Sequence, residues 1–103
     1  MGEAQRHLES TLAGDKRAFG EVVSAYREMA MGLARRKLGR EALAEEAVQE
    51  AFLAAYLNLA SLRSTAAFGP WLRTILEHCC SRIQRKEQSG RTQSIQDDVP
   101  DSE

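Results

Sequence analysis

The chain has 103 residues, enough for one small domain, and its longest apolar runs fall far short of a membrane span. The N-terminus lacks the apolar centre of a signal peptide, and Arg6 stands where a myristoylation motif needs Ser or Thr. We therefore expect a soluble, cytoplasmic protein with no membrane contact.

The formal net charge of −1 hides an uneven distribution. Four of the 15 acidic residues lie in residues 92–103, which contain no base, so the rest of the chain carries 14 bases against 11 acids. Several of the bases lie in residues 73–91. A mildly basic helical end can meet phosphates, although solvated surface charge is the commoner explanation of such a bias.

Hydrophobic spacing predicts helices and gives no strand-like alternation of useful length. A first helix, about Glu3 to Leu12, is short and weakly patterned. Asp15 is expected to cap a second helix, whose apolar residues recur every three or four positions as far as Leu38. Gly39 is well placed to end that helix in the left-handed conformation.

A third helix is predicted from about Glu41 to Leu59, followed by a loop over 60–65. The fourth helix contains Pro70, which has no N–H and would break a bond beyond the first helical turn. We therefore expect regular helix to begin near Phe68 or later. The predicted fold class is all-α: a small antiparallel bundle of three long helices plus a short N-terminal helix.

From Arg85 onward the sequence is polar, with almost no residue that a core would bury. Such a segment cannot offset the entropy of ordering and is expected to be a disordered linker. The predicted division is a helical domain over 1–88 and a tail over 89–103.

Residue types that carry catalysis are not arranged for it. There is no Gly-rich phosphate loop and no His–carboxylate helix motif. Cys79 and Cys80 are adjacent, so on a helix they point about 100° apart and cannot form an ordinary disulfide or chelating pair. We expect Cys79 to pack in the core as a small apolar residue and Cys80 to be less firmly held there. The prediction is a protein that is not an enzyme and needs no cofactor or metal.

One edge of the third helix is crowded with Glu45, Glu46, Gln49 and Glu50. Taken alone, such an edge is usually a solvated surface. The segment "LAEEAVQEAFLAAYLNLASLRSTAAFGPWLRTI" nevertheless resembles, without a gap, the second conserved region of bacterial extracytoplasmic-function (ECF) sigma factors of the sigma-70 family. The resemblance spans about residues 10–86. The positions that carry it are Gly14, Asp15, Ala18, Phe19, Tyr26, Glu45, Glu46, Val48, Gln49, Glu50, Ala51, Phe52, Tyr56, Arg63, Phe68, Trp71, Leu72 and Ile75.

The resemblance implies a protein partner for the acidic edge. In the family this helix docks on the clamp helices of the RNA polymerase β′ subunit, and carboxylates facing basic side chains suit that contact. The residues it assigns to polymerase binding are Glu45, Glu46, Gln49, Glu50 and Leu53.

The resemblance also implies recognition of promoter DNA. The loop and the exposed face of the fourth helix would open the minus-ten element and capture a flipped base of the non-template strand. The residues assigned to DNA are Ser61, Leu62, Arg63, Ser64, Thr65, Arg73, His78, Arg82, Arg85 and Lys86. Phe68 and Trp71 are expected in the core rather than as stacking platforms.

The sequence departs from the family pattern in the region that the resemblance assigns to promoter reading. Ser64 replaces a typical Gly, His78 stands where Asn is common, and Arg82 where Asp is common.

Family members also continue into a helix-turn-helix domain and have anti-sigma partners. The end of this chain resembles the start of the linker to that domain, and we interpret the chain as an excised domain rather than a natural truncation. Two alternatives stay open: a sigma-like module that binds an anti-sigma factor or another helical protein without opening a promoter, and a plain helical oligomerisation module.

Overall fold

The computed structural model describes residues 2–92, and within them the regular structure is helical. The helices are α1 (Gly2–Leu12), α2 (Ala18–Leu38), α3 (Glu41–Leu57) and α4 (Phe68–Thr92), with short 3₁₀ turns over Leu59–Ser61 and Thr65–Ala67. None of the described helices combines the length and apolar character needed to cross a bilayer.

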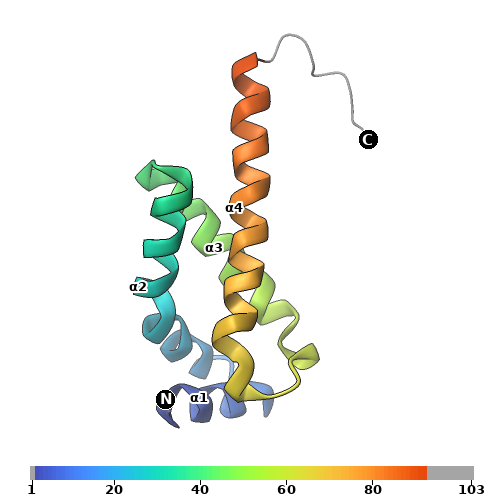
Figure 1. Cartoon of the computed structure of the whole chain (residues 1–103). Coiled ribbons are helices and arrows are strands. Elements are labelled where there is room, and N and C mark those ends of the chain that lie inside the picture. Colours follow the sequence, from blue (N-terminus) through green and yellow to red (C-terminus); the bar gives the residue numbers. More distant parts are fainter. Residues whose placement is uncertain (1, 93–103) are drawn as a thin grey trace.

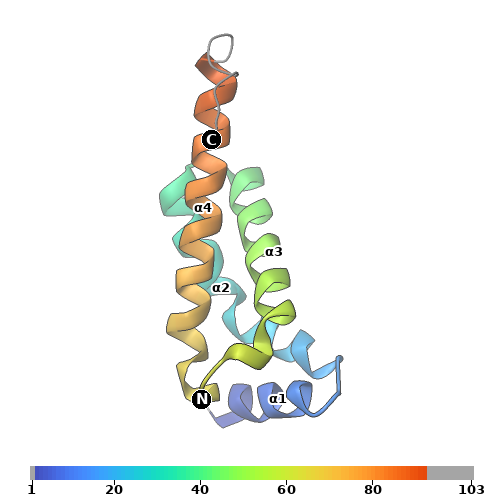
Figure 2. The same cartoon turned by 90° about the vertical axis from the view of Figure 1, so that its right-hand side faces the viewer.

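Three helices stand side by side and the fourth lies across their end. α2, α3 and α4 run up, down and up, so each is antiparallel to the next along the chain, while α1 crosses the end at which α2 and α4 begin (Figures 1 and 2). The last turns of α4 extend past the α2–α3 turn (Figure 1). The predicted all-α antiparallel bundle is confirmed.

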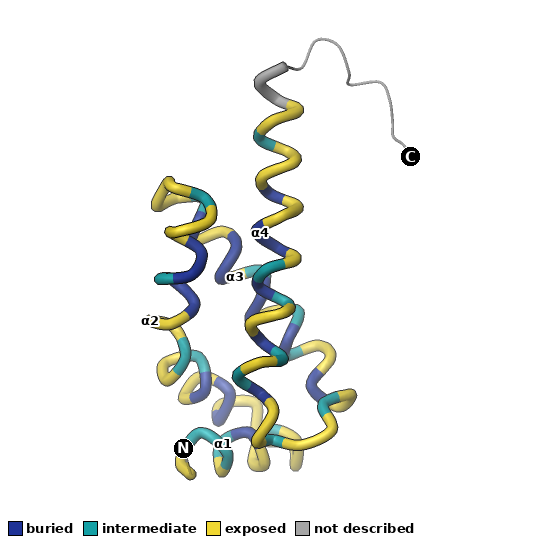
Figure 3. The backbone as a smooth tube through the Cα atoms, viewed as in Figure 1, coloured by how far each residue is buried: buried dark blue, intermediate teal, exposed yellow. Residues whose placement is uncertain are grey.

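The core lies between α2, α3 and α4, whose buried sides face one another (Figure 3). The inner side of α3 is rich in alanine, and the four alanines there are at most 1 % exposed. Small residues at a helix contact let neighbouring helices approach closely. These alanines are Ala44, Ala47, Ala51 and Ala55.

Aromatic rings close the end of the core nearest α1. Phe68 is fully buried, with its ring centroid 5.1 Å from that of Tyr26 and 5.8 Å from that of Trp71. Trp71 is half-buried and packs against the core. Phe68 therefore belongs to the core, as the sequence predicts, and Trp71 packs at its edge.

The α2–α3 turn follows the predicted rule for a helix end. Gly39 has φ of 75°, and its N–H donates to the carbonyl of Arg35 at 2.9 Å. The Arg35 guanidinium then donates two hydrogen bonds to the Glu41 carboxylate, at 2.9 and 3.1 Å. These bonds lower the pKa of Glu41 below its ordinary value, and they tie the end of α2 to the start of α3.

The start of α4 also agrees with the sequence. The Ser64 hydroxyl accepts the N–H of Ala66 at 3.2 Å and so caps the turn over Thr65–Ala67. α4 begins at Phe68, which places Pro70 in its first turn, where a missing N–H costs no hydrogen bond.

Helix boundaries near Asp15 and Leu59 differ from the prediction. Asp15 does not cap α2, because its carboxylate accepts the N–H of Arg17 at 3.1 Å in a turn that precedes the helix. α3 ends at Leu57, since the next residue is Asn58, whose side chain donates to the Ala54 carbonyl at 2.8 Å and turns the chain.

The prediction of a linker from Arg85 onward is wrong for 85–92, which continue α4. Contacts with the α2–α3 turn hold this part in place. Gln84 donates to the Lys37 carbonyl at 2.8 Å, and Arg40 pairs with Glu87 at 3.2 Å. The rest of the predicted tail, 93–103, lies outside the described residues, and the division at 88 stays a prediction.

Candidate functional site

The outward side of α3 carries a stripe of four residues that we call the outer stripe: Glu46, Gln49, Leu53 and Leu57. Their spacing of three, four and four residues keeps them on one side of a helix. Within residues 2–92, Glu46 and Gln49 have no side-chain hydrogen bond or ion pair. Leu53 and Leu57 are 59 % and 69 % exposed. The stripe is therefore polar in its first half and apolar in its second.

The carboxylates beside the outer stripe reach toward neighbouring helices. Glu45 turns to α2, where its carboxylate lies 4.0 Å from Arg27. Glu50 turns to α4, where its carboxylate accepts a hydrogen bond from Arg82 at 2.7 Å. Exposed pairs of this kind contribute little to stability, but they neutralise both members. Of the four polar residues predicted to bind polymerase, Glu46 and Gln49 are thus the ones that point freely outward.

A groove of about 370 Å³ runs between α3 and α4, and we call it the α3–α4 groove. It brings together two residues predicted to bind polymerase, Glu50 and Leu53, and two predicted to bind DNA, His78 and Arg82. Its lining residues are Glu50, Leu53, Ala54, Leu57, Ile75, His78, Cys79 and Arg82. The sequence separates these residues into two surfaces, whereas the structure places them in one.

The loop before α4 is held by its own hydroxyls. Ser61 donates to the Asn58 carbonyl at 2.8 Å, and Thr65 accepts a hydrogen bond from Gln5 of α1 at 3.5 Å. Leu62 is half-buried and packs against the core. Arg63 is exposed and, among the described residues, has no ion pair.

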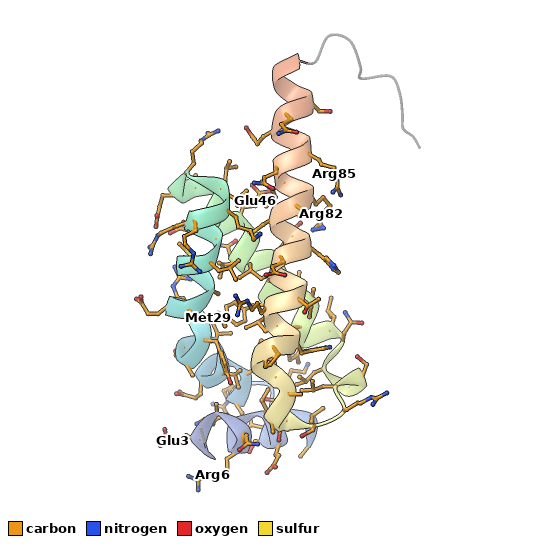
Figure 4. All side chains as sticks on the ribbon, in the orientation of Figure 1. Glu3, Arg6, Met29, Glu46, Arg82 and Arg85 are labelled. Atoms are coloured by element: carbon orange, nitrogen blue, oxygen red, sulfur yellow. The ribbon has the colours of Figure 1, made fainter. Side chains whose placement is uncertain are left out.

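The basic residues predicted to contact DNA do not form one patch. Arg73 lies on the α2 side of α4, 3.7 Å from Glu77, and lines a hollow of about 480 Å³ that Met29 also lines. Arg82 and Arg85 leave α4 on the side away from α2 (Figure 4). Lys86 is exposed on the part of α4 near the α2–α3 turn. Figure 4 also shows Glu46 near the level of Arg82, while Glu3 and Arg6 lie at the opposite end, on α1.

Gln5, which the sequence analysis did not single out, helps to line a second hollow, of about 340 Å³, beside the loop. Gln5 and Tyr26 meet Thr65 there, next to Gly69 and Pro70. Gln5 is 60 residues from Thr65 along the chain, and no local pattern connects them. Only the packing of α1 across the bundle end brings them together.

Both cysteines are structural. Cys79 is buried as predicted. Cys80 is fully buried as well, so the expectation that it is less firmly held in the core is wrong. Burial raises the pKa of both thiols, which therefore stay protonated and unreactive at neutral pH. No cluster of three or more His, Cys, Asp or Glu side chains suited to a metal occurs in residues 2–92.

Comparison with known proteins points to one family. Residues 22–90 match the family model of Sigma-70 region 2. The chain is 32 % identical over 84 residues to the ECF RNA polymerase sigma factor SigW of Bacillus subtilis, covering 81 % of the chain and 45 % of that protein. It is 34 % identical over 93 residues to the RNA polymerase sigma-H factor of Pseudomonas aeruginosa, covering 85 % and 48 %.

A third relative is the ECF RNA polymerase sigma-E factor of Haemophilus influenzae, 38 % identical over 71 residues, which covers 69 % of the chain and 37 % of that protein. The chain spans less than half the length of these curated relatives. α1 lies before the matched region of the family model.

Proposed function

The chain belongs to the sigma-70 region 2 family, in the part of it represented by ECF sigma factors, and on that premise we propose that it docks on RNA polymerase and binds the promoter minus-ten element. It does so by binding alone, without covalent chemistry. Docking uses the outer side of α3, and strand binding uses the 58–67 loop with α4.

The observation that carries the proposal is that the side chains of Glu46 and Gln49 are exposed and make no contact with polar neighbours in the described part of the bundle. Both are exposed at the middle of α3, and within residues 2–92 neither side chain is engaged by a neighbour. A carboxylate and an amide that are free on a rigid helix can form charge-assisted and neutral hydrogen bonds with basic side chains at low ordering cost. The clamp helices of the polymerase β′ subunit are the partner that the family resemblance gives to this surface.

The DNA half of the proposal depends on the loop and on the exposed basic side chains along α4. Arg63, Arg85 and Lys86 are exposed and can contact phosphates. Outside residues 92–103 the chain has only three more basic residues than acidic ones, so few phosphate contacts are expected. Affinity for an isolated strand should accordingly be weak and should fall as salt rises. Opening of the promoter would take place in the polymerase complex rather than on free DNA.

A second candidate is a sigma-like module that binds an anti-sigma factor or another helical protein and never opens a promoter. The division of the predicted DNA residues between the two sides of α4 favours it, because a strand-binding surface usually gathers its basic groups along one track. It uses the same outer stripe, so protein binding alone does not distinguish the two functions.

The polymerase half is tested by titrating core RNA polymerase with labelled wild type and with Glu46→Lys. Reversing this free charge should weaken binding about tenfold or more, because an attraction becomes a repulsion. Glu9→Lys on α1 makes the same charge change at an exposed position and should bind as wild type does. Equal binding by all three proteins would show that α3 is not the docking surface.

The DNA half is tested on the polymerase-bound protein with fluorescent minus-ten non-template strands and scrambled strands. The proposal expects preference for the minus-ten strand and a loss of affinity in Arg63→Gln. Polymerase binding without any preference between strands would favour the second candidate.

A further inference from the structure

The exposed apolar residues of the bundle are unevenly placed. In residues 2–92 the large hydrophobic side chains that are exposed are Leu12, Met29, Leu53 and Leu57. Single exposed hydrophobics are normal on a soluble protein. Leu53 and Leu57, however, are one turn apart on α3 and open into the same α3–α4 groove. A pair of exposed apolar side chains beside a groove is typical of a binding surface.

The groove is apolar at its base and electrically balanced at its rim. Ala54, Ile75 and Cys79 line it together with the two leucines. At the rim, Arg82 donates to the Glu50 carboxylate at 2.7 Å and lies 3.9 Å from the Cys79 sulfur. Since Glu50 and Arg82 compensate each other, this pair adds no net charge to the leucine-lined recess, which does not resemble a phosphate site.

The groove is continuous with the free polar half of the outer stripe. Glu46 lies seven residues, about 10 Å or two turns, before Leu53 on the same side of α3. A partner that covers this length needs a basic group over Glu46 and an apolar side chain at Leu53 and Leu57. A helix with basic and apolar residues two turns apart meets both requirements. Single-stranded DNA does not, because Glu46 would repel its phosphates.

We propose that the α3–α4 groove is part of the protein-docking surface and receives an apolar side chain from a helix of the polymerase. The inference depends on the proposed docking through α3 and extends it to Leu57, Ala54 and Ile75. It also moves Arg82 from the DNA surface to this one: Arg82 is a positioning residue that holds the Glu50 carboxylate at the rim.

The test measures the affinity of core RNA polymerase for Leu57→Glu, Leu57→Met and Leu12→Glu, beside wild type. A carboxylate in the apolar recess should weaken binding about tenfold, whereas methionine keeps the apolar contact and should bind within about twofold of wild type. Leu12→Glu introduces the same charge at an exposed leucine on α1, away from the groove, and should leave binding unchanged. Because Leu57 is exposed, Leu57→Glu should fold, which circular dichroism checks.

The positioning role of Arg82 has its own readout. Arg82→Gln should weaken polymerase binding, and Arg82→Lys should restore part of it, while the preference of the bound complex for the minus-ten strand stays as in wild type. A loss of strand preference in Arg82→Gln with polymerase binding unchanged would return Arg82 to the DNA surface.

Other outcomes separate the inference from the function on which it rests. If Leu57→Glu binds polymerase as wild type does while Glu46→Lys does not, the groove is outside the contact and only the inference fails. If neither change matters, docking through α3 fails as well. If wild type sediments as a dimer and Leu57→Glu as a monomer with unchanged polymerase affinity, the groove is a contact between two copies and the inference is overturned.

Discussion

The side of α3 that faces the bundle and the side that faces solvent share one backbone but are built from different residues. The inner side has buried alanines together with Val48 and Phe52. The outer side has Glu46, Gln49, Leu53 and Leu57, which make no contact that the bundle requires. The stability of the fold therefore depends on one side of this helix, and the other side can change its chemistry while the fold persists.

The neighbours Phe52 and Leu53 give the strongest contrast. Phe52 is 6 % exposed and its ring lies 6.5 Å from that of Phe19, whereas Leu53 projects into solvent. Phe52→Ala should lower the free energy of unfolding by about 3–5 kcal/mol, because it removes buried apolar area and leaves a cavity. Leu53→Ala should change it by less than about 0.5 kcal/mol. Urea denaturation measures both, and similar losses would contradict the assignment of sides.

Alanine offers a second contrast on the same helix. Ala47 is fully buried where α3 meets its neighbours, while Ala42 is exposed. Ala47→Leu adds volume to a closely packed contact and should lower the free energy of unfolding by about 1–3 kcal/mol. Ala42→Leu makes the same change toward solvent and should leave it unchanged within about 0.5 kcal/mol. Thermal unfolding followed by circular dichroism compares them.

The Glu50–Arg82 pair marks the boundary between the two sides. The side chains of Glu50 and Arg82 are both exposed, so their coupling should be small. A double-mutant cycle with Glu50→Gln and Arg82→Gln should give a coupling of about 0.2–1 kcal/mol in the free energy of unfolding. The same cycle with Arg85→Gln in place of Arg82→Gln should give no coupling, since Arg85 has no ion pair within the described residues. A coupling near zero for Arg82 would show that the pair is not maintained in solution.

The smallest effect is expected at Glu41, where the carboxylate pairs with Arg35. The folded-state pKa of Glu41 is lowered, chiefly by hydrogen bonds from Arg35, so the pair contributes stability above the ordinary pKa of 4.5. That contribution is lost as pH falls through the lowered pKa. Wild type should therefore be more stable than Glu41→Gln at neutral pH, and the difference should shrink as the solution is acidified through the lowered pKa of Glu41. A difference that is constant with pH would mean that the pair is not the cause.

Local rules predicted much of this fold because they concern neighbours in sequence. Gly39 ends α2 in the left-handed conformation, and Pro70 falls in the first turn of α4, since both depend on backbone geometry alone. Apolar spacing predicted the inner sides of the helices for the same reason. The sequence does not predict the helicity of the polar segment 85–92, because that helicity depends on Gln84 and Glu87 reaching the α2–α3 turn.

The candidate surfaces were harder to predict than the helices. The sequence grouped Glu46 and Gln49 with Glu50 on one edge of α3, and the family resemblance assigned all of them to one surface. Neither could show that Glu50 turns away to Arg82, which is 32 residues distant. Nor could either show that the side of α4 bearing Arg73, about two and a half turns from Arg82, is the side that faces α2. Such facts depend on how each helix is rotated against its neighbours, which local patterns do not encode.

Pro70 has a further consequence for the loop that precedes it. If α4 grew backwards through 58–67, Pro70 would fall inside a helix, where a missing N–H and a ring clash cost about 3 kcal/mol. Pro70 thus disfavours an α-helix over these ten residues, which keep their two 3₁₀ turns whether or not anything is bound. If the loop binds a strand as proposed, little conformational entropy would be lost in shaping it on binding.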